Sequence, residues 1–216
     1  MKDLHRWLNT RLGDAIVIRA TGAQVARFAL ALDPADLPAD LEADALFLHR
    51  SFRLGDRLPH LSVIASHDGF DAALTTGQNL PLARALGWQD VQPIMPEGAA
   101  GLLGTPPQTH WPELLAALAT EFGGYEALLD PPDPQVSRLA FMNAMQPALL
   151  TAVAAQGAQV YVTGQMRPGA LPRARELGLG VVALGHRRTE LWGLRQLARD
   201  LQTAFPGLEC RIYGEA

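Results

Sequence analysis

The chain has 216 residues, which is enough for one large domain or two smaller lobes. Hydrophobic residues make up 48% and charged residues 19%, a composition that fits a packed core and excludes a disordered chain. The net charge of −4 does not favour nucleic acid, and no apolar run is long enough to cross a bilayer. Cys210 is the only cysteine and the N-terminus lacks the apolar stretch of a signal peptide, so we expect a cytoplasmic protein without disulfides.

The first half of the chain predicts a less regular succession of elements than the second half. Residues 4–12 are expected to form a helix, and the apolar runs at 45–48 and 61–66 indicate buried strands. Further elements are expected at 15–19 and 25–32 (strands) and at 80–86 and 111–122 (helices).

Two stretches rich in glycine and proline interrupt this pattern. Residues 98–107 and 130–134 indicate connectors, and the first lacks the Gly-Lys-Ser/Thr ending of a phosphate-binding P-loop. We expect two α/β lobes to meet around these breaks, one formed by residues 1–105 and the other by residues 106–216. The C-terminal helix and strand could also pack back on the first lobe.

The second half alternates regularly between strands and helices. Strands are expected at 138–142, 159–163, 180–184 and 208–213, and helices at 147–156, 170–177 and 189–205. Alternation of this kind predicts parallel strands joined by right-handed crossovers.

Imidazole and carboxylate side chains follow several of the apolar runs. His49 follows one run, His67 and Asp71 follow the next, and His186 and Glu190 follow a run in the second half. Because ligands bind beyond the carboxyl ends of the strands in an open parallel sheet, these side chains are candidates for a common site. Imidazole nitrogen with carboxylate oxygen is a ligand mixture for zinc, manganese, iron or nickel.

We predict that His49, Asp71, His186 and Glu190 bind a divalent metal ion. Glu190 falls in the first turn of a helix that begins near Thr189, where the helix dipole favours a carboxylate, and His186 lies in the loop before it. The absence of a thiolate from the set indicates a site with open positions for water or substrate. The alternative is that each histidine is a hydrogen-bonded structural residue.

Arginines are frequent in the loops after the strand ends. They could form a cationic mouth that favours a phosphorylated or carboxylated substrate, or they could be solvated loop residues. The residues are Arg50, Arg53, Arg57, Arg167, Arg187 and Arg188. Ser66, His67 and Asp68 spell the letters of a catalytic triad, but the chain has no Gly-x-Ser-x-Gly elbow, which argues against a serine hydrolase.

Several segments carry a resemblance to a known family. The chain resembles the Nif-three-like family in four places. They are Ala43 to His49, the spacing His67-x-x-x-Asp71, Val160 to Gln165 and Gly185 to Glu190. Its members are also called GTP cyclohydrolase I type 2 homologues or dinuclear-metal-centre hexameric proteins. The resemblance extends over residues 25–213 and implies two similar three-layer α/β lobes with mostly parallel sheets.

The resemblance also implies a hexameric ring of identical subunits with metals between the two lobes of each chain. It matches His49, Asp71, His186 and Glu190 to the family's metal ligands. It matches His67 to a histidine near the metals, which would be the proton carrier of a catalysed reaction.

The chain departs from the family pattern at several positions. A His-His pair is reduced to His49, which is followed by Arg50, and a Thr-Gly-Glu segment ends in Gln165. Arg167 stands where histidines are expected, and residues 143–145 replace a glycine-rich turn. The two negative charges of the predicted carboxylate ligands balance one divalent ion, so we expect one metal per chain, or none with Arg50 in place of the second.

Two functions follow as competing hypotheses. The first is a metal-dependent hydrolase of the cyclohydrolase type that acts on a small anionic or heterocyclic substrate, with His67 transferring the proton. The second is a non-catalytic metal carrier or protein-interaction ring with a degenerate metal site. We expect neither nucleic acid nor a membrane as a partner.

Overall fold

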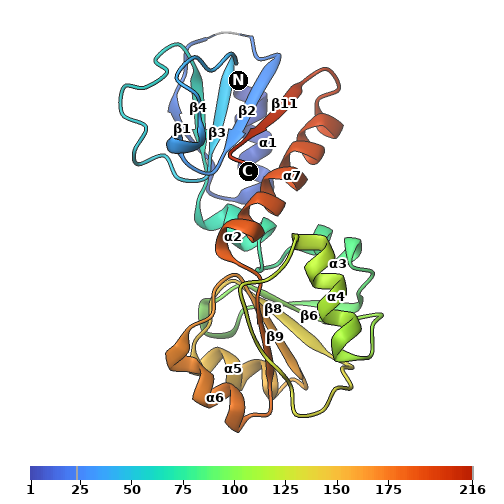
Figure 1. Cartoon of the computed structure of the whole chain (residues 1–216). Helices are drawn as coiled ribbons and strands as arrows, with labels where there is room; N and C mark the ends of the chain where they lie inside the picture. The colour runs from blue at the N-terminus through green and yellow to red at the C-terminus, as the bar shows by residue number, and fades with distance from the viewer. Residues whose placement is uncertain (23, 216) are drawn as a thin grey trace. The chain divides into compact units, whose positions relative to one another are not determined.

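The computed structural model describes residues 1–22 and 24–215 (Figure 1). The chain forms two compact units, one of Met1–Phe70 with Gly193–Ala216 and the other of Asp71–Trp192. The first unit therefore combines both ends of the chain. This division differs from the expected boundary after residue 105, because residues on both sides of that position pair in one sheet of the second unit.

The first unit contains a five-stranded sheet with the order β1-β4-β3-β2-β11. The strands are β1 (Ile16–Arg19), β2 (Arg27–Ala31), β3 (Ala45–Leu48), β4 (Ser62–Ala65) and β11 (Glu209–Tyr213). The four strands from β4 to β11 pair in parallel, and β1 is antiparallel at the edge. The last strand of the chain thus returns to pair with β2, an arrangement that the sequence left open.

Different kinds of segment cover this sheet. Helix α1 (Lys2–Leu12) buries Leu4, Leu8 and Leu12, which recur every four residues along one helix face. It lies beside the C-terminal part of α7 (His186–Ala204), where Trp7 packs edge-on against Phe205 at 6.1 Å between ring centroids (Figure 1). A separate hydrophobic cluster contains strand residues and leucines from irregular segments, one of which follows the short η1 helix (Pro34–Asp36). These leucines are Leu37, Leu41, Leu54 and Leu58.

The second unit contains a six-stranded sheet with the order β5-β6-β8-β9-β10-β7. The strands are β5 (Gln89–Ile94), β6 (Gly101–Thr105), β7 (Ala127–Leu129), β8 (Leu139–Met142), β9 (Val160–Thr163) and β10 (Gly180–Ala183). Only β8, β9 and β10 pair in parallel, and the outer pairs are antiparallel. The expected α/β class is confirmed, but this sheet is mixed, because the short connection from β5 to β6 joins neighbours only as a hairpin.

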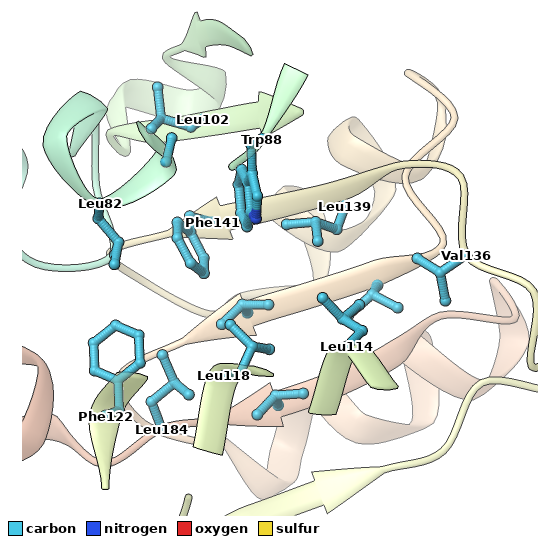
Figure 2. Close-up of a cluster of buried hydrophobic side chains, with 14 of the residues drawn as sticks. Leu82, Trp88, Leu102, Leu114, Leu118, Phe122, Val136, Leu139, Phe141 and Leu184 are labelled. Carbon is cyan, nitrogen blue, oxygen red and sulfur yellow. The ribbon is translucent and has the colours of Figure 1, made fainter. Parts of the chain in front are cut away.

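Helices lie on both faces of the second sheet, so this unit has three layers. One face carries α3 (Leu80–Ala85) and α4 (Trp111–Phe122), and the other carries α5 (Pro147–Ala154) and α6 (Leu171–Glu176). Strand β8 serves both clusters, since Leu139 and Phe141 face the first and Ala140 and Met142 face the second. Figure 2 shows the first cluster, in which the rings of Trp88 and Phe141 are 4.3 Å apart.

The glycine-rich stretch at 98–107 contains a strand and is not only the expected connector. Residues Gly101–Thr105 form β6 in the interior of the sheet. A Cβ at Gly101 would overlap the sulfur of Met142, and one at Gly104 would lie 2.9 Å from the Trp88 ring. The glycines thus admit neighbouring side chains close to the strand, which composition alone does not reveal. Residues 130–134 are a connector, but one that lies inside the second unit.

The remaining elements follow the sequence expectations with two kinds of exception. Helix α2 (Asp68–Leu74) and strands β5 and β7 were not expected, and α7 begins at His186 rather than near Thr189. Throughout residues 1–22 and 24–215, each helix is too short or too polar to serve as a membrane span.

Candidate metal centre

Two parallel strands deliver the first candidate ligands. His49 directly follows β3 and His67 comes two residues after β4, and the ends of these strands are paired through Leu48 and Ala65. Asp71 lies in the first turn of α2, four residues after His67. One ligand atom from each of His49, His67 and Asp71 lies within 4.8 Å of the other two.

The two imidazole rings of this group are stacked. Their centroids are 4.5 Å apart with an interplanar angle of 4°, and Phe70 packs against the His49 ring at 4.9 Å. Nδ1 of His49 lies 3.2 Å from the carbonyl oxygen of Ser66, and Nδ1 of His67 lies 2.7 Å from a carboxylate oxygen of Asp68. Because Nδ1 of each ring has a partner, Nε2 is the nitrogen suited to bind a metal.

The donor set fits a divalent ion. Two ligand atoms at about 2.1 Å from one ion are at most about 4.2 Å apart, so a spread of up to 4.8 Å requires only small side-chain movements. Two imidazoles with one carboxylate form a set that leaves positions for water or substrate. His67 was expected near the metal as a proton carrier, whereas the structure groups its ring with the candidate ligands.

The second predicted pair, His186 and Glu190, lies on the first turns of α7. Nε2 of His186 is 3.0 Å from a carboxylate oxygen of Glu190, and Glu190 is 1% exposed whereas the His186 side chain is 59% exposed. The expected loop position of His186 is wrong, because the helix starts at this residue and places the pair one turn apart on one face. The structure thus places the four predicted ligands in two separate pairs, His49 with Asp71 and His186 with Glu190.

A pocket of about 490 Å³ in the second unit is lined by one member of each pair, Asp71 and His186. Asn143, Gln165 and Arg167 line the same pocket. These three residues belong to positions at which the chain departs from the pattern of the family that it resembles. The departures therefore change the wall of the pocket that Asp71 and His186 share.

Gly164 lies in close contact with the start of α7, a contact that the sequence did not predict. It follows β9, and a Cβ at this position would lie 3.2 Å from Oγ1 of Thr189 and 3.6 Å from Cα of His186. Oγ1 of Thr189 in turn donates a hydrogen bond of 2.8 Å to the carbonyl oxygen of His186. Glycine at 164 thus allows the start of α7 to pack against the end of β9.

Two of the loop arginines lie beside carboxylates within their own units. Nε of Arg50 donates to a carboxylate oxygen of Asp33 at 2.8 Å, and Arg188 lies 3.6 Å from Glu126. Each of these charges is balanced by a neighbouring carboxylate. Arg167 is the expected arginine that lines the pocket with Asp71 and His186.

A family model for Duf34/NIF3 (NGG1p interacting factor 3) matches residues 59–214. A protein of Pseudomonas aeruginosa named GTP cyclohydrolase 1 type 2 homolog is 29% identical over 147 residues, which cover 67% of this chain and 58% of that protein. A protein of the same name from a Nostoc species is 27% identical over 189 residues, covering 76% of this chain and 71% of that protein. This chain thus spans little more than half the length of the Pseudomonas relative.

Solved structures share the fold over nearly the whole chain. A protein named ybgI, described as of unknown function, has a TM-score of 0.78 at 20% identity, covering 98% of this chain and 96% of that chain. TTHA1606 from Thermus thermophilus has a TM-score of 0.74 at 20% identity, covering 100% of this chain and 98% of that chain. Together with the family model over residues 59–214, these likenesses lead to one conclusion: the chain belongs to the Duf34/NIF3 family.

Proposed function

We propose that this chain binds one divalent metal ion through His49, Asp71, His186 and Glu190, with His67 as a further ligand. The observation that carries the proposal is the group of three ligand atoms, from His49, His67 and Asp71, within 4.8 Å of one another. The two carboxylates of the set neutralise one divalent ion and leave a second ion without a counter-charge, which favours a single metal per chain.

The activity that we propose is hydrolysis of a small anionic or heterocyclic molecule. When bound, a divalent ion supplies Lewis-acid polarisation of a substrate oxygen and acidification of water. Buried Glu190 orients the exposed His186 ring from a distance of 3.0 Å, and the polar wall around Asn143 and Arg167 offers hydrogen-bond donors to an anion. The name of the relatives from Pseudomonas and Nostoc, GTP cyclohydrolase 1 type 2 homolog, agrees with this reaction class.

Metal analysis of the purified protein tests the proposal. We expect about one equivalent of zinc, manganese, iron or nickel per chain, and loss of most of it in H49A and D71N. H60A is the matched control, because His60 is an exposed histidine outside the group of three. Two equivalents per chain would contradict a single ion, and wild-type protein without metal after reconstitution would contradict the site.

The role of His67 separates two variants of this proposal. If His67 is a ligand, we expect H67A to bind the ion more weakly by at least about 10- to 100-fold, because that range is already the cost of losing a residue that only supports a ligand. If His67 only transfers a proton, H67A keeps its metal and loses only turnover. The short distances to His49 and Asp71 favour the ligand role.

A second candidate function is a non-catalytic metal carrier or interaction ring. It is favoured by the residues that replace family-pattern groups in the pocket wall, Asn143, Gln165 and Arg167. Hydrolysis of nucleotides and small heterocycles by the metal-loaded protein, compared with D71N, distinguishes the two functions. Equal turnover by both proteins, or none by either, would favour the carrier.

We also propose that the chain assembles with itself into a hexamer and acts in the cytoplasm. The support is the family likeness together with a sequence that contains a single cysteine. Native mass spectrometry tests the assembly, with an expected mass of six times the 23.3 kDa chain.

A further inference from the structure

Asp14 lies in the short segment between α1 and β1 and accepts hydrogen bonds from one neighbouring loop. Its carboxylate receives a short hydrogen bond from the Ser66 hydroxyl. Its Oδ2 accepts the backbone N–H groups of His67 and Gly69, at 3.3 and 2.9 Å. Ser66 and His67 form the connection from β4 to α2, and Gly69 lies in the first turn of α2, which also contains Asp71.

This contact caps α2 from a distant part of the chain. The first N–H groups of a helix have no partner within the helix, and a carboxylate there also suits the helix dipole. The fit is tight, because a Cβ at Gly69 would overlap the Leu12 carbonyl oxygen and lie 2.9 Å from Cγ of Asp14. Asp14 thus joins the segment after α1 to the β4–α2 connection and to the start of α2.

The side-chain contact of His67 with Asp68 restrains the His67 ring only weakly. Its side chain is 55% exposed, and its hydrogen-bond partner Asp68 is 96% exposed, so this pair is solvated and holds the ring weakly. The hydrogen bond to Asp14 instead holds the backbone of His67, and the His67 ring stacks on the buried His49 ring. Asp14 also lines a pocket of about 320 Å³ with both histidines.

We propose that Asp14 is the positioning residue of the metal centre. Through Ser66, His67 and Gly69, its carboxylate sets the stacked arrangement of the His49 and His67 rings that a metal ion would bind. Asp14 is not itself a ligand. The consequence for metal affinity rests on the proposed function, whereas the effect on the two rings does not require a metal.

The test compares D14A and D14N with wild-type protein. In the metal-free protein, we expect D14A to shift the imidazole Cε1–H NMR signals of both His49 and His67, with a smaller shift in D14N, which keeps an acceptor oxygen. Titration with Zn²⁺ against a chromophoric chelator should show about 10- to 100-fold weaker binding by D14A. D14N should recover part of that loss.

D44A is the matched control. Asp44 also accepts two backbone N–H groups in the first unit, those of Ala26 and Arg27, but it precedes β3 whereas His49 follows this strand. We expect D44A to lower the stability and leave the His49 and His67 signals and the Zn²⁺ affinity as in wild type. If D14A does not fold, as judged by circular dichroism, D14N and S66A take its place.

Unchanged ring signals in every folded Asp14 variant would overturn the proposal, and so would equal shifts in D44A. Unchanged Zn²⁺ affinity in D14A, with the wild type binding Zn²⁺, would also overturn it. Wild-type protein that binds neither Zn²⁺ nor the manganese, iron or nickel ions named above would end the proposed function, and the metal-free NMR comparison would still decide the role of Asp14.

Discussion

At the scale of single residues, side chains that hydrogen-bond to the main chain hold distant segments together, both at the candidate site and away from it. Asp14 and Asp44 each tie together segments distant in the sequence through main-chain N–H groups. The hydroxyl of buried Tyr161 likewise donates to the carbonyl oxygen of Ala144, at 2.5 Å, and holds the loop that lines the pocket of the second unit. Burial also raises the pKa of Tyr161, so its hydroxyl stays a donor.

Asp44 provides a prediction on pH dependence. The backbone N–H groups of Arg27 and Ala26 lower the pKa of its carboxyl below the ordinary value of 3.8. The ionised form therefore stabilises the folded state above pH 3.8, and this contribution is lost as the pH falls through the folded-state pKa. We expect D44N to lower the free energy of unfolding by about 1 kcal/mol at pH 7.

Urea denaturation of D44N and wild type at pH 7 and at pH 3 or below measures this effect. The difference between the two proteins should narrow at the lower pH, because the wild-type carboxyl then gains its proton. A difference of the same size at both pH values would show that the charge of Asp44 is not responsible.

At the scale of elements, the start of α7 determines how the second pair of candidate ligands is displayed. Because the helix begins at His186, this residue and Glu190 share one face and form an ion pair. The packing of this helix start against the end of β9 leaves little room, as the contacts around Gly164 show.

We therefore expect G164A to destabilise the second unit by about 1–3 kcal/mol, the usual cost of overpacking. The added methyl group would press on Oγ1 of Thr189, which is hydrogen-bonded to His186. Thermal and urea denaturation measure the loss, and metal content reports on the displacement of His186. G169A is the control, since a Cβ at Gly169 meets nothing within 4 Å. Equal stability of the two variants would contradict the steric explanation.

At the scale of the whole molecule, the first unit is assembled from both ends of the chain. Its sheet is completed by β11, and residues of helix α7 belong to both units.

A metal ion that binds only the folded protein stabilises it by mass action. The free energy of unfolding rises by about 2.7 kcal/mol at a free ion concentration 100 times the Kd.

Removal of the ion should therefore lower the thermal midpoint of unfolding. We expect EDTA to lower the midpoint of metal-loaded wild type by several degrees and to leave that of D71N unchanged, as measured by differential scanning calorimetry. Re-addition of excess Zn²⁺ should restore the wild-type value. An equal effect of EDTA on both proteins would show that the chelator does not act through Asp71.

The sequence by itself determined the elements with strong local patterns and the chemistry available to them. The α/β class is confirmed, and so are the apolar strands and amphipathic helices of residues 138–213. They could be predicted because hydrophobic periodicity depends only on residues that are close in the sequence. The candidate ligands His49 and Asp71 could be found from their places after apolar runs, and the structure brings their side chains together.

The tertiary structure alone decided the rest, because these features depend on contacts between distant residues. The glycines of β6 predicted a connector from composition, whereas the structure shows that they make room for the side chains of Met142 and Trp88. The boundaries of the two units depend on the pairing of β11 with β2. The hydrogen bonds of Asp14 to the backbone of His67 and Gly69 join residues that no sequence spacing connects. Local periodicity specifies an element, whereas its partner is specified by packing.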